Sequence, residues 1–117
     1  MLHLNHKKLD LWKLSIKFVS LVYELTKNFP PEERFGLTSQ LRRASVSVSS
    51  NIAEGSSRKS SNERARFYEI ARSSLVEIDT QLIIAIRLNF IDRKSAKPVE
   101  LLLERLFAMS TNLIKKT

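Results

Sequence analysis

Apolar residues at alternating intervals of three and four are the feature that most constrains how this chain can fold. The first segment with this spacing contains Leu11, Leu14, Phe18, Leu21 and Leu25. A segment near the other end repeats it with Val99, Leu102, Leu106, Met109 and Leu113. Residues three and four apart lie on one face of an α-helix, so both segments predict amphipathic helices. Each helix needs a partner to cover its apolar face.

Two segments in the middle of the chain carry the same helical pattern. The earlier one contains Leu37, Leu41, Ala44, Val48 and Ile52. The later one contains Phe67, Ala71, Leu75, Ile78, Leu82 and Ala85. No segment competes with the alternation of apolar and polar residues that is typical of a β-strand. The predicted fold class is therefore all-α.

Prolines and capping residues give the expected helix ends. Pro30 and Pro31 end the first helix because proline lacks an amide donor, and Pro31 also suits the first turn of the next helix. Gly55 is expected to cap the second helix in the left-handed conformation. Ser60 is expected to cap the third helix, with Glu63 completing a capping box.

These signals define four helices joined by short connections. Pro98 suits the start of the last one. The expected helices cover about residues 8–28, 31–55, 61–88 and 97–115. Helices of comparable length with short connections predict an antiparallel up-down-up-down four-helix bundle. We expect one domain, residues 1–117.

Two of these helices have more apolar surface than one bundle core requires. In the first helix the apolar arc spans roughly 220°, whereas a surface helix needs about 100° or somewhat more. In the third helix, residues 82–86 are apolar on every side. One interpretation is a helix wedged deeply among its neighbours, and the favoured one is contact with a second copy. The candidate interface residues are Trp12, Ile16, Val19, Tyr23, Ile83, Ile84 and Ile86.

The residue content argues against several kinds of chemistry. The chain has no cysteine, which excludes disulfides, cysteine zinc sites and thiol catalysis. Both histidines, His3 and His6, precede the first helix, and no glutamate has the Glu-x-x-His spacing of di-iron bundles. A glycine-rich phosphate loop is also missing. We therefore expect no catalytic residue, no metal site and no cofactor, in a protein that is not an enzyme.

The hydropathy pattern predicts a cytoplasmic protein. Apolar residues make up 43% of the chain and charged residues 27%, which is ordinary for a folded soluble protein. No uninterrupted apolar run is long enough for a signal peptide or a membrane span. We expect no membrane partner.

The net charge of +8 raises the question of a polyanionic partner. Clustered lysine and arginine side chains neutralise phosphates and release counterions. The best local cluster brackets the connection between the second and third helices and consists of Arg58, Lys59, Arg64 and Arg66. Lys13 and Lys17 on the first helix extend the candidate contact set. The alternative is a solvated turn on an evenly basic surface.

A polar stripe follows the second helix beside its apolar stripe. It consists of Gln40, Arg43, Ser47, Asn51, Glu54 and Arg58. One interpretation is a boundary seam whose polar groups satisfy one another, with Glu77 of the third helix as a partner. The other is a groove for a polar ligand or for the backbone of RNA. We keep both open, and the first is favoured because the acids alternate with the arginines.

Several local motifs, taken together, resemble a known family. The most specific are Gln40-Leu41-Arg42-Arg43-Ala44 and Asn51-Ile52-Ala53-Glu54-Gly55. They are joined by Leu9 to Trp12, Tyr23-Glu24-Leu25-Thr26, Phe29-Pro30, Ser47-Val48 and the run from Phe67 to Glu77. Nearly the whole chain resembles the bacterial four-helix-bundle proteins, also called 23S ribosomal RNA intervening-sequence proteins. Ser73 departs from the pattern, because the family usually has glycine there.

The resemblance carries expectations about assembly more than about activity. It implies antiparallel bundles assembled as rings of five, so a pentamer is the favoured homo-oligomer. The family name describes a location inside 23S ribosomal RNA genes and does not describe an activity. Our leading functional hypothesis is a binding module for RNA or a ribonucleoprotein without strong sequence preference. The alternative is an oligomeric protein–protein scaffold or accessory subunit with no nucleic-acid role.

Overall fold

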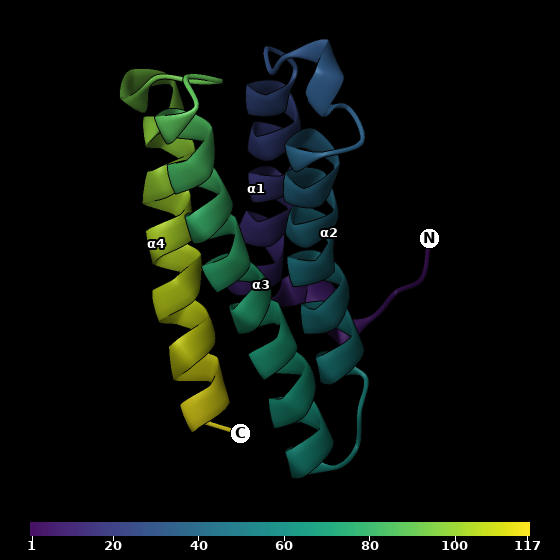
Figure 1. The fold of residues 1–117 in the computed structure, drawn as a ribbon. Coiled ribbons are helices and arrows are strands. Elements are labelled where there is room, and N and C mark those ends of the chain that lie inside the picture. Colours follow the sequence, from purple (N-terminus) through teal and green to yellow (C-terminus); the bar gives the residue numbers. More distant parts are fainter.

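The computed structural model describes all 117 residues and contains four α-helices. Their bounds are α1 (Asp10–Thr26), α2 (Leu37–Ser56), α3 (Ser61–Arg87) and α4 (Arg93–Lys115). Short 3₁₀ helices occupy Asn5–Lys8 (η1) and Pro31–Glu33 (η2). The colours in Figure 1 show α1 and α3 running upward and α2 and α4 running downward. The predicted four-helix bundle is confirmed. None of its helices is both long and apolar enough to span a bilayer.

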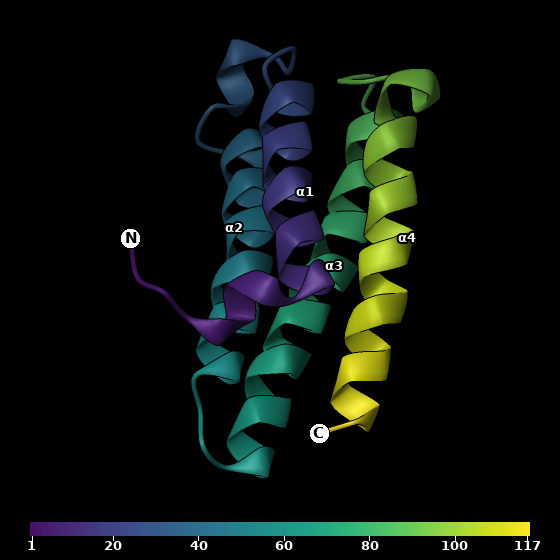
Figure 2. The same ribbon diagram turned by 180° about the vertical axis from the view of Figure 1, so that it is seen from behind.

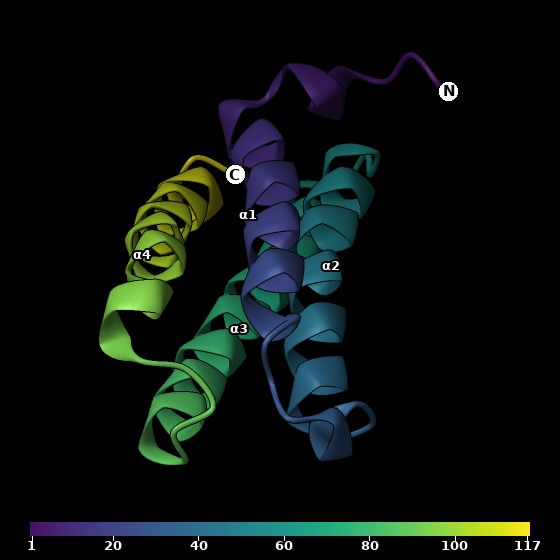
Figure 3. The same ribbon diagram turned by 90° about the horizontal axis from the view of Figure 1, so that it is seen from above.

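The helices pack in a ring of neighbours, in the order α1, α2, α3, α4 and back to α1. The diagonal pairs α1–α3 and α2–α4 make no comparable approach, and Figure 3 shows α2 and α4 on opposite sides of α1. The bundle therefore has four outer faces, each formed by one neighbouring pair. The α1–α2 face lies opposite the α3–α4 face, and the α2–α3 face lies opposite the α4–α1 face.

The core follows the predicted stripes of α2 and α3 and shifts slightly in the other two helices. Every predicted apolar position of α2 is buried, as are those of α3 except the half-buried Phe67. In α1 the buried seam continues through Ser15 and Val22, whereas Leu14, Leu21 and Leu25 are half-buried against it. The shift is possible because the Ser15 hydroxyl accepts a hydrogen bond from Ser49 Oγ at 2.9 Å. A satisfied hydroxyl can occupy a core position at little cost.

The starts of α2 and α4 differ most from the sequence-based expectation. Pro31 begins the separate helix η2, and α2 starts only at Leu37. Helix α4 starts at Arg93, earlier than predicted, and Pro98 lies inside it. Asp92 caps α4, because its carboxylate accepts a hydrogen bond from the Ser95 amide at 2.7 Å. That bond stabilises the charged carboxylate and lowers the pKa of Asp92.

Gly55 has a different role from the predicted one. It lies within α2, is buried, and does not adopt a positive φ. A Cβ atom built at Gly55 would lie 2.8 Å from Cε1 of Tyr68, which is closer than packed atoms tolerate. Glycine is therefore needed for the close approach of α2 to α3, and α2 continues to Ser56.

The N-terminal segment is more ordered than its position suggests. Figure 2 shows it crossing the outside of the bundle before α1 begins, and η1 contacts both α1 and α2. His6 is buried, and its ring packs edge-to-face with the Trp12 ring, with 5.0 Å between ring centroids. Trp12 is consequently half-buried within its own chain.

Candidate functional site

A polar groove lies between α2 and α3 and contains most of the predicted stripe. Its volume is about 310 Å³. It is lined by Gln40, Arg43, Ala44 and Ser47 of α2 and by Ser74, Glu77 and Gln81 of α3. Ala44 is the only apolar residue among these, so the groove is suited to a ligand that forms hydrogen bonds. We call it the α2–α3 groove.

One cross-helix hydrogen bond fixes the register of the groove. Ser74 Oγ donates to Ser47 Oγ at 3.0 Å, and Asn51 Nδ2 donates to the same oxygen at 3.0 Å. Because α2 and α3 are antiparallel, this contact places Arg43 opposite Glu77, one turn further along the groove. Both charged side chains are exposed, and neither forms an ion pair. The groove therefore offers an unpaired cation and an unpaired anion on facing walls.

The floor of the groove contains a buried polar side chain that the sequence reasoning did not single out. Gln81 is 7% exposed, and its Oε1 atom has no hydrogen-bond partner. A buried acceptor without a partner costs about 1–3 kcal/mol. The helical spacing could have identified Gln81, because it lies three residues after the buried Ile78 and is therefore a polar residue at a core-facing position.

The lower part of the stripe is exposed at the surface. Glu54 Oε2 and Arg58 Nη2 lie 3.1 Å apart, with side chains 48% and 41% exposed. The interpretation of the stripe as a buried seam therefore does not apply to Glu54. Glu77, the expected partner of the stripe on α3, does not reach Glu54. It lines the groove at the level of Arg43.

Replacing Glu54 by alanine should lower the free energy of unfolding by at most about 0.5 kcal/mol. Exposed ion pairs four residues apart on a helix contribute about 0.3–0.5 kcal/mol, and alanine is a better helix former. Urea denaturation monitored by circular dichroism measures the difference. Ile52→Ala, two residues earlier in the core, is the reference and should lose about 2–5 kcal/mol. A loss above 1 kcal/mol for Glu54→Ala would contradict the exposed position.

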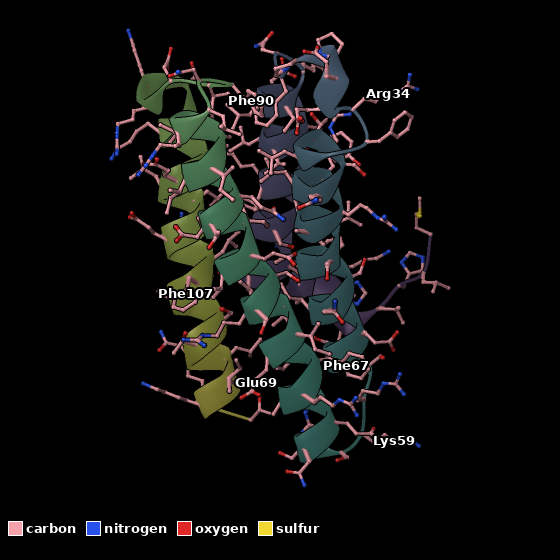
Figure 4. All side chains as sticks on the ribbon, viewed as in Figure 1. Arg34, Lys59, Phe67, Glu69, Phe90 and Phe107 are labelled. Atoms are coloured by element: carbon pink, nitrogen blue, oxygen red, sulfur yellow. The ribbon has the colours of Figure 1, made fainter.

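The predicted basic cluster at the α2–α3 turn separates into two kinds of residue. Arg64 Nη1 donates to the carbonyls of Lys59 at 2.7 Å and Arg58 at 3.3 Å, and the Arg58 guanidinium covers the Phe67 ring at 4.9 Å. These two arginines hold the turn together. Lys59 and Arg66 are exposed without ion pairs, and Figure 4 shows Lys59 pointing away from the helices. Only these two cations of the cluster are free for a partner.

The remaining candidate cations lie elsewhere. Lys13 and Lys17 are exposed on the outer side of α1, about 80° and 120° around the helix from Tyr23, and no hydrogen bond or ion pair joins them to the turn. Ser61 donates to the Thr117 carbonyl at 2.6 Å, which brings the end of α4 beside the turn. At the opposite end of the bundle, four exposed cations surround the α3–α4 connection and had not been predicted as a cluster. They are Arg87, Arg93, Lys94 and Lys97.

The candidate interface residues fall on three faces. Ile16 and Tyr23 are 43% and 40% exposed on the α1–α2 face, with the half-buried Trp12 and Val19 beside them. Ile83 is 56% exposed on the α3–α4 face. The other two candidates differ, because Ile84 lies on the α2–α3 side and Ile86 packs against the core. The apolar run of α3 is thus divided among the core and two faces.

Comparison with known proteins agrees with these motifs and this fold. The sequence profile of a family described as 23S rRNA-intervening sequence protein matches residues 7–112. The chain belongs to this family. No curated protein matches the chain. The α2–α3 groove is thus a feature of a 23S rRNA-intervening sequence protein.

A solved structure has the same fold as this 23S rRNA-intervening sequence protein. It is a protein of unknown function from Bacteroides thetaiotaomicron, described as a member of the S23 ribosomal protein family. The TM-score is 0.80 at 20% sequence identity, and the match covers 90% of this chain and 98% of that chain. At this identity the similarity concerns the fold alone.

Proposed function

We propose that the protein is a non-enzymatic, cytoplasmic homo-oligomer that binds RNA through its basic surface without strong sequence preference. The observation that carries the proposal is that most lysine and arginine side chains form no ion pair. Of 20 lysine and arginine residues, only Lys27 and Arg58 form ion pairs. Exposed cations without partners are available to neutralise phosphates, which is the main source of sequence-independent affinity for nucleic acids. Counterion release applies to any polyanion, and single-stranded RNA is the one that we test first.

The Lys59→Gln/Arg66→Gln variant should bind single-stranded RNA with a weaker dependence on salt. These are the two free cations of the turn, while Arg58 and Arg64 are retained because they hold it together. Each neutralised phosphate contributes roughly 0.7 to the slope of log K against log salt for single strands, so the slope should fall by about 1.4. Fluorescence anisotropy of a labelled oligonucleotide at several salt concentrations measures the slope.

The matched control is Arg93→Gln/Lys94→Gln at the other end of the bundle. It removes one lysine and one arginine that are also exposed. We expect a smaller change of slope from this control. Equal changes from both variants would show diffuse attraction with no contact site at the turn. If the wild-type protein has no affinity for RNA near physiological salt, the RNA proposal fails and the protein–protein scaffold replaces it.

The proposed assembly is supported by two apolar faces on opposite sides of the bundle. On the α1–α2 face, Ile16 and Tyr23 are joined by Val46, which is 41% exposed. On the α3–α4 face, Ile83 is joined by Val76, which is 50% exposed. Two different faces that are both unpartnered favour a head-to-tail contact, which closes into a ring when the rotation between copies permits. This geometry is compatible with the ring of five that the family resemblance implies.

Charge favours the same pairing. The grooves of the α3–α4 face contain Asp79, Glu100 and Glu104, and none of these carboxylates forms an ion pair. The α1–α2 face carries the Arg42 guanidinium over the Tyr23 ring at 4.6 Å. Opposite potentials on contacting faces fix orientation and disfavour contact between two copies of the same face.

A further inference from the structure

We propose that the α2–α3 groove binds an unpaired guanine base, supplied either by a free nucleotide or by single-stranded RNA. The RNA source rests on the proposed function, whereas the free-nucleotide source is independent of it. The inference is carried by the set of hydrogen-bonding groups that the groove leaves unpartnered: Arg43, Glu77 and Gln81.

The two charged walls match the two edges of guanine. The O6 and N7 atoms of guanine accept hydrogen bonds, and an arginine that donates to both is the commonest specific contact to this base. Arg43 is the one cation lining the groove and has no ion-pair partner. The N1–H and N2–H₂ groups of guanine are adjacent donors, and a carboxylate with two oxygens accepts from both. Glu77, opposite Arg43, provides that carboxylate.

The other bases satisfy only part of this set. Adenine and cytosine each present a single amino group beside a ring acceptor, and uracil presents a single imino N–H between two carbonyls. A carboxylate facing any of these bases would accept one hydrogen bond and oppose a base acceptor with its second oxygen. Guanine alone presents two adjacent donors to Glu77 and two adjacent acceptors to Arg43. The arrangement therefore selects guanine.

The floor of the groove adds a group that needs a donor. The Oε1 atom of Gln81 is buried without a hydrogen-bond partner, and a rotation of the Gln81 side chain toward the groove that its residue lines would bring this acceptor to a ligand N–H. Unsatisfied buried polar atoms are uncommon in folded proteins. A ligand N–H that completes the hydrogen bonding of Gln81 would remove this cost.

Two exposed apolar side chains lie on α3 beyond the two ends of the groove lining. Ile70 and Ile84 are 38% and 42% exposed, and they lie seven residues before and after Glu77, along the same line of the helix. Each lies about 10 Å along α3 from Glu77, so in a bound strand they are placed to contact a neighbouring nucleotide and not the base held at Glu77. Recognition of RNA commonly combines such contact with the face of an unstacked base and hydrogen bonds to its edges.

The first experiment titrates guanosine monophosphate into the 117-residue protein and follows amide chemical shifts by NMR. We expect saturable shifts at groove residues, and affinity for adenosine, cytidine and uridine monophosphates weaker by about fivefold or more. The phosphate is common to all four ligands, so the difference between them reports the base. Equal responses to all four nucleotides, or no response at the groove, would overturn the proposal.

Matched variants test the assigned residues. Glu77→Gln should weaken binding of guanosine monophosphate by about fivefold or more, because an amide cannot accept from both guanine donors. Glu69→Gln removes an exposed glutamate from the same helix outside the groove and should leave binding unchanged. Both side chains are exposed, and circular dichroism verifies that both variants fold. Equal affinities of the two variants would contradict the role of Glu77.

RNA binding separates this inference from the proposed function. With guanine-containing and guanine-free single strands of equal length, Glu77→Gln should remove the preference for guanine and leave the salt slope unchanged. Lys59→Gln/Arg66→Gln should lower the slope and keep the preference. RNA affinity without any preference for guanine, together with no binding of guanosine monophosphate, would reject the groove and leave the proposed function intact. Binding of guanosine monophosphate without affinity for RNA would reject the proposed RNA binding and leave the assignment of the groove intact.

Discussion

Replacing Ile16 by glutamate should convert the assembled protein into monomers. Ile16 is 43% exposed at the centre of the apolar stripe on the α1–α2 face. If that stripe is buried against a second copy, a carboxylate there loses its hydration without gaining a partner, which costs several kcal/mol. Light scattering at micromolar concentration should give several times 13.5 kDa for the wild-type protein and about 13.5 kDa for the variant.

Ile83→Glu on the opposite face should have the same effect, because a head-to-tail contact uses one face of each kind. An equal mixture of the Ile16→Glu and Ile83→Glu variants should then form dimers of twice 13.5 kDa, since each variant retains the face that the other has lost. Ser73→Glu, which adds the same charge at an exposed position of α3 outside both faces, is the control and should stay assembled.

The outcomes of the mixing experiment discriminate between arrangements. A wild-type monomer at micromolar concentration would contradict the proposed assembly itself. If each variant alone forms dimers, the two faces make separate contacts, each with its own kind. If the mixture remains monomeric, the two side chains do not belong to complementary sides of one interface.

Replacing Phe18 by alanine should lower the free energy of unfolding by about 3–5 kcal/mol. Phe18 is completely buried in the core of the bundle. Removing the ring loses its transfer free energy and leaves a cavity that neighbouring side chains fill only in part. Since domains of this size are stable by only about 5–15 kcal/mol, the loss is a large share of the total. Urea denaturation followed by circular dichroism gives the difference.

Phe35→Ala provides the same chemical change at the surface. Phe35 is 87% exposed, and its ring contacts the Arg34 guanidinium at 5.2 Å. Exposed contacts of this kind contribute about 0.5–1 kcal/mol, so the loss should not exceed that range. A similar loss at both positions would mean that the α1 seam does not face the core as described. Because unfolding of an oligomer depends on concentration, both variants are compared with the wild type at one protein concentration.

The periodicity of apolar residues was sufficient to predict the bundle because it depends only on local geometry. Every residue of a helix advances by the same angle, so the buried faces of α2 and α3 follow directly from the spacing of residues such as Leu41 and Ile78. The helix ends were harder to predict from the sequence. The start of α4 depends on the Asp92 cap, which competed with the signal from Pro98. Likewise, a glycine near the end of a helical segment predicts a C-terminal cap, and only the neighbouring Tyr68 ring shows why glycine is required at position 55.

The candidate site was predicted in part. The stripe on α2 is a pattern within one helix and could be read from the sequence. Glu77 on α3 was also predicted, as a partner of the stripe. Ser74 and Gln81 could not be assigned to it, because their place depends on the antiparallel register that the Ser47–Ser74 hydrogen bond defines. The same limit applied to the basic turn, where the sequence counts four cations and the structure leaves only Lys59 and Arg66 free.

The sequence by itself determined which residues form helices and which side of each helix is apolar, because both properties repeat along one chain segment. Only the tertiary structure decided how the apolar surplus is divided. Adjacent residues of one helix point in directions about 100° apart, so Ile83 and Ile84 reach different faces once α3 has neighbours on both sides. Whether a polar or charged side chain is paired, buried or free depends on the helix beside it, and that neighbour is distant in the sequence.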